Sequence, residues 1–488
     1  MIMSVRIGTV AFIVQAPRGS SSYSYCSGFC RKRLVDFIFD PLNKTWMVDG
    51  AFSWYDPLNE NWSMPIEYIN DFIEYLRIQA PSINIRKVLI PEYKTRDIEI
   101  SLNEGIVPRD NQKEALEYLC DDRYNRKGLS LIMGMGKTFS AIYSISHFKK
   151  ASIIIISGLL DQWINEILKC TNLKREDIYL LKLTKSIHTL LESKLQPKII
   201  VASLETVREY IKKTALNECL MPFEDILIKY GIGVKIFDEV HLKFLTTTQI
   251  DLRCPNVPQN FYLSGTFKRN NPSTNKIFKK IYPKMIIFKK GRVRKHINTS
   301  VYAFWVYVPD KTISTKYGYN HCRFEKYLMK NVTKFKRFYN TVLIPIIEDH
   351  FINLKNKNEK CLIYFSTIDF KKKILPLLQE LYPNLKVIMF TSKDVDAKLL
   401  DADIVLSNFA KLGTGKDVPK VRTVINTIST KNDIIIEQVM ERARPIPDVD
   451  AEFVTVFNAN SNVCVNHYKG IRDMLKTKSN KYAEIKIC

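Results

Sequence analysis

The sequence lacks a long apolar run. No stretch approaches the ~18 apolar residues that a membrane-spanning helix needs. The short apolar run from Thr9 to Val14 is not preceded by the basic region of a signal peptide. The ten cysteines are scattered, and the single close pair, Cys26 and Cys30, does not supply the second ligand pair of a zinc site. These absences argue against a membrane protein and favour reduced thiols in a cytoplasmic protein.

Internal repeats and low-complexity segments are also absent from the sequence. The seven histidines form no metal-ligand pattern, and no constellation typical of a nuclease, a deaminase or a protease is present. Hydrophobic residues make up 46% of the chain and charged residues 25%, which is an ordinary balance for a globular protein. A length of 488 residues predicts roughly three domains.

Acidic residues are few relative to basic ones. The chain has 74 Lys and Arg but 50 Asp and Glu, which gives a formal net charge of +24. Such an excess favours a polyanionic partner, most often nucleic acid and less often an anionic membrane. Eleven basic residues and no acidic ones lie between Lys268 and His296. A solvated basic face is the alternative to a phosphate-binding track. The proposed nucleic-acid contacts within this run are Lys289, Lys290, Arg292 and Arg294.

Continuous apolar, β-branched runs alternate with helical patterns from about Gln112 onward. Strands of this kind between helices are what a parallel sheet buried on both faces requires. The runs are 152–157, 198–203, 234–239 and 260–265, followed by 361–366, 386–392, 403–408, 422–427 and 452–458. The sequence therefore predicts an α/β fold with two tandem parallel sheets.

The first hundred residues have a different pattern. Residues 5–14, 34–40 and 45–55 predict strands, and apolar residues at helical spacing predict a helix over 65–80. This mixture predicts a small N-terminal α+β domain.

A glycine-rich segment, Met133-Gly134-Met135-Gly136-Lys137-Thr138, begins a helix predicted to extend through His147. Glycines let backbone N–H groups converge on phosphate oxygens. Lysine reaches the outer phosphates, and the threonine hydroxyl ligates Mg²⁺. Leu131 occupies the first position of the longer G-x-x-x-x-G-K-[ST] pattern, so a simple glycine turn before a helix is the alternative.

An acidic pair, Asp238 and Glu239, follows the apolar run VKIF and precedes Val240 and His241. Carboxylates at the carboxyl end of a buried strand can face a nucleotide bound at the neighbouring loop. We expect Asp238 to hold Mg²⁺ and Glu239 to position and polarise the attacking water. Surface acidic pairs are common, but one placed downstream of Gly-Lys-Thr favours ATP hydrolysis.

With these motifs in this order, residues 105 to 460 resemble the superfamily 2 helicases, with a DEVH version of the DEAD/DEAH box. The resemblance implies two RecA-like lobes, hydrolysis of ATP with Mg²⁺, and contacts to a nucleic-acid strand. The matching residues are Arg109 and Gln112 (adenine-reading Q motif), Gln162 with Trp163 (motif Ia), Ser203 to Thr206 (a further strand-contacting motif) and Ser264-Gly265-Thr266 (motif III).

The second series of runs carries the remaining motifs. Phe365-Ser366-Thr367 resembles motif IV, and the segment with Gly415 and Asp417 resembles motif V at the ATP site. Arg442 and Arg444 lie in a segment that resembles motif VI, where arginines stabilise charge on the γ-phosphoryl group and contribute ~10³ to 10⁵ in rate. Glu441 replaces the usual glycine, and the arginine spacing is one residue short. Which arginine reaches the phosphate stays open, and a structural role is the alternative for either.

Within superfamily 2, the chain most resembles phage recombination helicases of the UvsW branch-migrating type. The resemblance rests on SGTFKRN at 264–270, on FAKLGTGKDVPKVRTVI at 409–425 and on the small domain before the core. It implies an ATP-dependent DNA helicase or translocase that acts on forks or four-way junctions during replication, recombination or repair. We expect a monomer in the bacterial host cytoplasm. An RNA helicase or remodeller and a nucleic-acid-binding protein with a non-cycling ATP fold are the alternatives.

The expected organisation has five parts. Residues 1–104 are an accessory, DNA-binding domain, and 105–296 are the ATP-binding lobe. Residues 297–345 are a basic connector or wedge-like segment, 346–460 are the second lobe, and 461–488 are a basic C-terminal helix.

Overall fold

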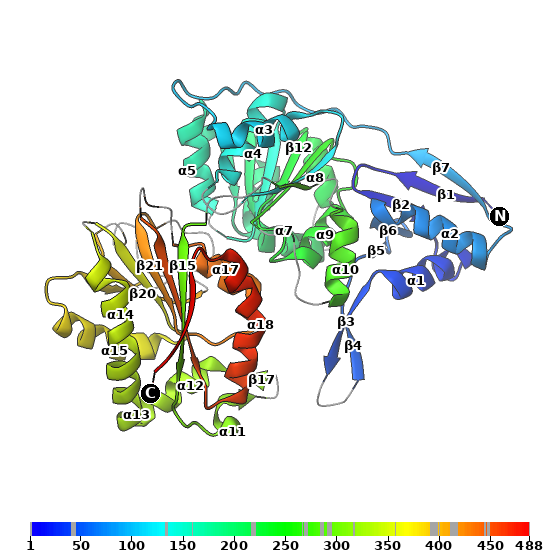
Figure 1. The fold of residues 1–488 in the computed structure, drawn as a ribbon. Coiled ribbons are helices and arrows are strands. Elements are labelled where there is room, and N and C mark those ends of the chain that lie inside the picture. The colour runs from blue at the N-terminus through cyan, green and yellow to red at the C-terminus, as the bar shows by residue number, and fades with distance from the viewer. Residues whose placement is uncertain are drawn as a thin grey trace. The chain divides into compact units, whose positions relative to one another are not determined.

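The chain forms two compact units, Met1–Gly291 and Arg292–Cys488. The first contains a mixed sheet and a parallel sheet, and the second contains a parallel sheet of its own (Figure 1). This confirms the predicted α/β fold, with two RecA-like lobes and a small N-terminal α+β domain. The computed structural model describes residues 2–40, 45–131, 135–158, 160–215, 221–265, 267, 272–283, 287–289, 295–315, 318–356, 358–390, 399, 401–409, 418–443, 446 and 449–487.

Two helices pack on a five-stranded sheet in the N-terminal domain. The strand order is β5-β6-β2-β1-β7, and every pair is antiparallel except β1 with β7. Phe29 of the first helix and Phe12 of the sheet both contact the ring of Phe72 on the second helix. The elements are β1 (Ile2–Ile7), β2 (Ala11–Gln15), α1 (Ser21–Arg33), β5 (Trp54–Asp56), β6 (Asn61–Pro65), η1 (Ile66–Tyr68), α2 (Ile69–Gln79) and β7 (Asn84–Leu89), with a separate hairpin of β3 (Val35–Asp40) and β4 (Thr45–Ala51).

A turn at Gly8 divides the run that was expected to form one strand into β1 and β2. The Gly8 N–H donates to the Ala11 carbonyl at 2.9 Å. A Cβ at Gly8 would lie 2.5 Å from the Pro255 carbonyl oxygen, so only glycine fits at this approach. The neighbouring Thr9 hydroxyl donates to the carbonyls of Pro255 and Val257. The break in the strand is therefore the point where the N-terminal domain contacts the first lobe.

Charged and aromatic side chains extend this contact within the first unit. Arg126 of the first lobe forms an ion pair with Glu67, and both side chains are largely buried. The rings of Phe52 and Phe244 lie 4.9 Å apart between centroids. The N-terminal domain and the first lobe are thus one packed body.

Glu67→Gln should destabilise this body, because it leaves the buried Arg126 guanidinium without its charge partner. Removing one member of a buried ion pair costs about 3 kcal/mol or more, and urea denaturation of the full chain would measure the loss. Asp121→Asn is the control, since its partner Arg123 is 80% exposed. Equal stability of the Glu67→Gln variant and the wild type would contradict the buried pair.

The parallel sheet of the first lobe has the order β10-β11-β9-β12-β13-β8-β14. β9, β11 and β12 are almost entirely buried, which matches their mainly apolar sequences, rich in Ile and Val. The strands are β8 (Arg126–Ser130), β9 (Ser152–Ile156), β10 (Ile178–Leu181), β11 (Ile199–Ser203), β12 (Val234–Phe237), β13 (Gln259–Ser264) and β14 (Ile287–Lys289).

Helices connect these parallel strands, so the loops that follow β8, β12 and β13 emerge side by side at one sheet edge. The helical segments are η2 (Asp110–Gln112), α3 (Lys113–Cys120), α4 (Lys137–Phe148), α5 (Leu160–Cys170), η3 (Arg175–Asp177), α6 (Thr184–Glu192), α7 (Leu204–Ala215), α8 (Phe223–Lys229), α9 (Phe244–Asp251) and α10 (Pro272–Ile281).

The second unit repeats the parallel architecture, with the strand order β19-β20-β18-β21-β22-β15-β23. Its strands are β15 (Ile297–Phe304), β18 (Lys360–Tyr364), β19 (Val387–Met389), β20 (Ile404–Ser407), β21 (Val421–Asn426), β22 (Ala451–Asn458) and β23 (Tyr482–Lys486), and β16 (Ser314–Thr315) pairs with β17 (Gly318–Tyr319) apart from the sheet. Its helical segments are α11 (Asp310–Ile313), α12 (His321–Lys330), α13 (Val332–Phe338), η5 (Tyr339–Leu343), α14 (Ile344–His350), η6 (Ile352–Leu354), α15 (Ile368–Leu381), α17 (Asp433–Met440) and α18 (Asn462–Lys478). Among the helices of the described residues, none has the length and apolar character that a bilayer crossing requires.

Two segments outside the expected second lobe belong to this sheet. β15, which begins the expected connector 297–345, pairs in parallel with both β22 and β23. The expected C-terminal helix is α18, and it is followed by the edge strand β23. Phe324, Phe335 and Phe338, aromatics of the connector, are buried in the core. The connector therefore packs as part of the second unit.

Candidate active site

The phosphate loop is closed by Gly136, which has a φ of 88° and precedes α4. A Cβ on Gly136 would lie 1.9 Å from the side-chain nitrogen of Gln112, so this position needs glycine for both its backbone and its space. Lys137 and Thr138 then form the first turn of α4, where free backbone N–H groups favour an anion.

Gln112 ties the segment before α3 to this loop. Its side-chain oxygen accepts from the Arg109 N–H at 2.9 Å, and its side-chain nitrogen donates to the Met135 carbonyl at 3.3 Å. Gln112 is 3% exposed, whereas the Arg109 side chain is exposed. Gln112 thus positions the loop, and the adenine-reading role expected for the pair stays a prediction.

The acidic pair lies beside the lysine, as the order of the strands requires. Lys137 Nζ is 2.7 Å from Glu239 Oε1, and the two side chains are 11% and 24% exposed. Glu239 has a φ of 52°, in the left-handed region that non-glycine residues rarely adopt. Its N–H donates to Asp238 Oδ1 at 2.9 Å. Strain of this kind persists where the surroundings hold it and is typical of functional sites.

The two carboxyls have different proton affinities. Burial, followed by the charge of Glu239, raises the pKa of Asp238 to about 6, although Lys137 and a hydrogen bond from Trp163 oppose the rise. Burial also raises the pKa of Glu239, but Lys137 and His241 outweigh it and lower that pKa overall. On acidification, Asp238 therefore binds a proton before Glu239, which stays ionised next to the lysine.

Trp163 contacts this site from α5. Its indole Nε1–H donates to Asp238 Oδ2 at 3.0 Å, and its side chain is 4% exposed. The sequence placed Trp163 with Gln162 in a strand-contacting motif, and its helical spacing with Ile164 and Ile167 reads as an ordinary core position. No local signal in the sequence indicates the hydrogen bond. Gln162, by contrast, is exposed.

His241 links the acidic pair to the end of β13. Its Nδ1 lies 2.7 Å from Ser264 Oγ and 3.3 Å from Glu239 Oε2, and the ring is 1% exposed. A Cβ at the next residue, Gly265, would lie 4.0 Å from Lys137 Nζ. The expected motif III segment therefore lies directly beside the lysine and the acidic pair.

The donor chemistry fits Mg²⁺ bound together with a nucleotide. The described residues contain no cluster of three or more His, Cys, Asp or Glu that could enclose a metal ion. Mg²⁺ prefers oxygen ligands and is usually held by one or two carboxylates, waters and substrate phosphates. The Asp238 carboxylate and the Thr138 hydroxyl are oxygen donors of this kind, so they are the residues that would hold the ion.

Other expected site residues lie apart from this cluster or outside the described residues. Ser203, half-buried, ends β11, and Lys289 ends β14, where its side chain is not described. Arg442 lies in the second unit, is 2% exposed, and lowers the pKa of Tyr364 against the stronger effect of burial. The expected residues outside the described part of the chain are Gly134, Lys290, Arg292, Arg294, Gly415, Asp417 and Arg444.

The segment resembling motif IV is held from within its own unit. The backbone N–H groups of Ser366 and Thr367, just before α15, donate to the carboxylate of Glu325 at 2.6 and 2.7 Å. Glu325 is 1% exposed, and burial raises its pKa to about 7 against these two bonds. A carboxylate at a helix N-terminus satisfies free N–H groups and the helix dipole, so this interaction fixes the start of α15.

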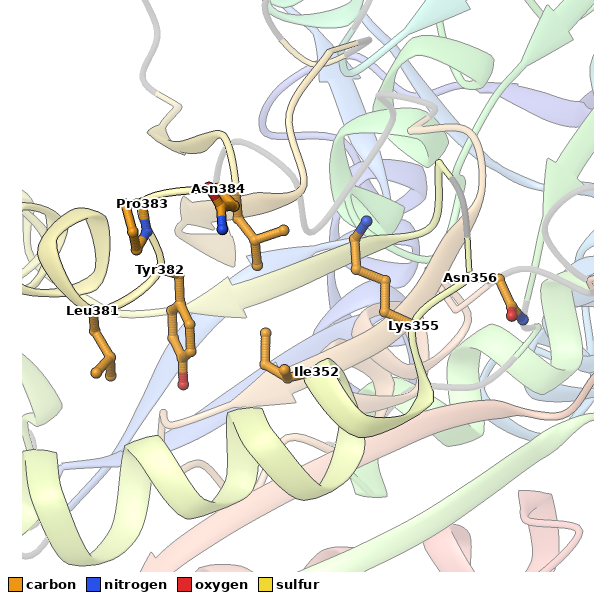
Figure 2. A pocket seen from close by; sticks show the side chains of 8 residues that line it. Ile352, Lys355, Asn356, Leu381, Tyr382, Pro383 and Asn384 are labelled. Atoms are coloured by element: carbon orange, nitrogen blue, oxygen red, sulfur yellow. The ribbon is translucent and has the colours of Figure 1, made fainter.

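A cavity of about 390 Å³ in the second unit is separate from these motifs. Figure 2 shows its lining side chains, which come from the segment after α14, from the last residue of α15 and from the turn that follows α15. The lining residues are Ile352, Lys355, Asn356, Leu381, Tyr382, Pro383, Asn384 and Leu385. The Lys355 amine already pairs with Asp403 at 2.9 Å. The lining of this cavity is partly polar and partly apolar and includes no expected catalytic residue. We therefore assign the active site to the cluster of Lys137, Asp238 and Glu239.

Residues 105–269 match the family described as type III restriction enzyme, res subunit. No curated protein matches the chain in sequence. The matched range contains the phosphate loop, the acidic pair, Trp163 and Ser264, so the match and the geometry concern the same part of the chain.

The chain is similar to several hundred chains of solved structures, and two of them illustrate the likeness. The crystal structure of T4 UvsW aligns with 100% of this chain and 99% of its own, at 15% identity and a TM-score of 0.37. The ATP-dependent type ISP restriction-modification enzyme LlaBIII bound to DNA aligns with 85% of this chain, at 13% identity and a TM-score of 0.51. The second alignment covers 34% of that enzyme, so the chain corresponds to about a third of its length. The alignment with LlaBIII supports the assignment of the α/β fold.

Gly136→Ala should weaken ATP binding and lower the free energy of unfolding. The backbone conformation alone costs about 1–2 kcal/mol, and the methyl group collides with Gln112. Gly105→Ala is the matched control, because Gly105 has a φ of 78° with nothing within 4 Å of its Cβ position. Adding Gln112→Ala should partly restore the Gly136→Ala variant in denaturation and nucleotide-binding assays. If Gly136→Ala and Gly105→Ala have the same free energy of unfolding and the same nucleotide affinity, the close approach of Gly136 to Gln112 is contradicted.

Proposed function

We propose that the chain is an ATP-hydrolysing DNA helicase or translocase of superfamily 2 that acts on branched DNA, which the family match over residues 105–269 supports. The observation that carries the ATPase site is the 2.7 Å contact between Lys137 and Glu239, which follow β8 and β12 on either side of β13. The family match covers this contact.

Each side chain of the cluster has a distinct task in this proposal. The Lys137 amine binds the outer phosphates, and Thr138 with Asp238 holds Mg²⁺. The ion, when bound, neutralises phosphate charge. Glu239 orients and polarises the attacking water, and its lowered pKa keeps the carboxylate ionised for this contact. Arg442 or Arg444 of the second lobe stabilises charge on the transferred phosphoryl group.

The distribution of charge supports a nucleic-acid partner held by the helicase lobes. Residues 105–291 contain 30 Lys and Arg against 18 Asp and Glu, and residues 292–488 contain 33 against 20. Residues 1–104 contain 11 against 12, so this domain has no general excess of positive charge. Any DNA contact there must come from local clusters such as the exposed Arg31, Lys32 and Arg33 at the end of α1.

DNA is favoured over RNA because the similar enzyme LlaBIII is bound to DNA. The preference for branched DNA, and a place in replication, recombination or repair, rest on the resemblance of 264–270 and 409–425 to UvsW-type helicases. One described lysine of the basic segment, Lys280, forms an ion pair with Asp71 and contacts the ring of Tyr68. It therefore joins the two domains of the first unit and is a weaker candidate for DNA.

Lys137→Ala should lower kcat for ATP hydrolysis by at least about 10²-fold, the scale lost when one charged transition-state contact is removed. Salt-sensitive DNA binding should persist, because it depends on many other cations. Phosphate release and fluorescence anisotropy at several salt concentrations measure the two properties. Lys185→Ala removes an exposed lysine of α6 as the control. Hydrolysis at the wild-type rate in Lys137→Ala would refute this ATP site.

A four-way junction should stimulate hydrolysis more than single-stranded DNA, and single-stranded DNA more than RNA of the same length. The expected cause is that a branched substrate engages more phosphates at once, which also predicts a steep decrease in affinity with salt. An ATPase panel across these polymers measures the order. Stronger stimulation by RNA would favour an RNA helicase, and absence of turnover with every polymer would favour a non-cycling ATP fold.

A further inference from the structure

The Asp238 carboxylate receives hydrogen bonds at both oxygens. Oδ1 accepts from the Glu239 N–H at 2.9 Å, and Oδ2 accepts from the Trp163 indole at 3.0 Å. The first donor is fixed by the backbone of the loop. The second comes from a different element, α5, and therefore ties the orientation of the carboxylate to the position of that helix.

α5 is held firmly on its buried side. Ile164, Ile167 and Cys170 are at most 4% exposed and pack in the core of the first unit. Trp163 lies on the same side, with its N–H directed at Asp238. Gln162, the preceding residue, is exposed. One helix thus carries a donor to the acidic pair and, at the preceding position, a side chain exposed for contact with a bound strand.

We propose that Trp163 is a positioning residue: its indole N–H orients Asp238 for Mg²⁺, and α5 transmits strand binding at Gln162 to that carboxylate. The inference rests on the proposed function, which places Mg²⁺ on Asp238 and nucleic acid at Gln162. Carboxylate ligands are themselves hydrogen-bonded, and loss of such a partner costs 10- to 100-fold in metal affinity.

Indole is required by both shape and chemistry. Its rings are buried in the core of the first unit, and its nitrogen supplies a donor that an aliphatic or phenyl side chain lacks. Phenylalanine at this position would preserve much of the packing and leave Asp238 Oδ2 without that donor. The two contributions of the side chain can therefore be separated.

Trp163→Phe in the full chain is the main test. Fluorescent ADP binding, measured across Mg²⁺ concentrations, should require about 10- to 100-fold more Mg²⁺ than the wild type needs. The affinity for ADP without Mg²⁺ should be the same as in the wild type. A variant that had lost its structure would also lose this Mg²⁺-independent affinity. Intrinsic tryptophan fluorescence should respond to Mg²⁺ with ADP in the wild type and lose that response in the variant.

Trp62→Phe is the matched control. Trp62 lies in the N-terminal domain, and its indole nitrogen is buried with no hydrogen-bond partner among the described residues. This variant should keep the wild-type Mg²⁺ requirement. In Gln162→Ala, DNA should stimulate the ATPase less than it stimulates the wild type.

A second replacement guards against misfolding. Trp163→β-(3-benzothienyl)alanine keeps the bicyclic shape and exchanges the N–H for sulfur. A raised Mg²⁺ requirement here supports the inference, and a wild-type requirement in this variant or in Trp163→Phe overturns it. If wild-type ADP binding does not depend on Mg²⁺ at all, the proposed function fails instead. Unaltered DNA stimulation in Gln162→Ala overturns the coupling through α5.

Discussion

The ion pair between Lys137 and Glu239 is the interaction on which the rest of the candidate site depends. The two residues are 102 positions apart in the chain and meet because β8 and β12 both flank β13 in one parallel sheet. A half-buried ion pair persists only where further bonds support its charges. His241 and Ser264 supply that support, and the left-handed backbone of Glu239 directs its carboxylate toward the lysine. The strand order, the backbone strain at Glu239 and the charges of the ion pair therefore all concern the same edge of the first-lobe sheet.

Much of the fold could be predicted from sequence because β9, β11 and β12 are buried on both faces and are mainly apolar, with Lys235 as the one charged residue among them. β8, the strand before the phosphate loop, could not, because Arg126 and Lys127 give it the character of a surface segment. The structure buries both cations: Lys127 Nζ donates to the Leu119 carbonyl at 2.7 Å, and Arg126 pairs with Glu67. Neither partner lies within the strand, so no local pattern reveals it.

The motifs predicted the residues that would react or bind ATP better than the residues that hold them in place. Gly136, Lys137, Asp238 and Glu239 lie in or beside one cluster, and residues 105–269, which contain this cluster, match the family described as type III restriction enzyme, res subunit. The role of Trp163 escaped prediction because its partner Asp238 is 75 positions away and its spacing indicates only burial. The arginines expected from the second lobe stay a prediction, since they belong to the other compact unit.

A structure of the full chain with Mg²⁺, ADP, aluminium fluoride and a four-way junction tests the central claim most directly. The account predicts the fluoride complex between the Lys137 amine and the Glu239 carboxylate, Mg²⁺ on Thr138 and Asp238, and an arginine from residues 292–488 beside the fluoride. Nucleotide bound away from Lys137, for example in the cavity beside Lys355 and Tyr382, would contradict it.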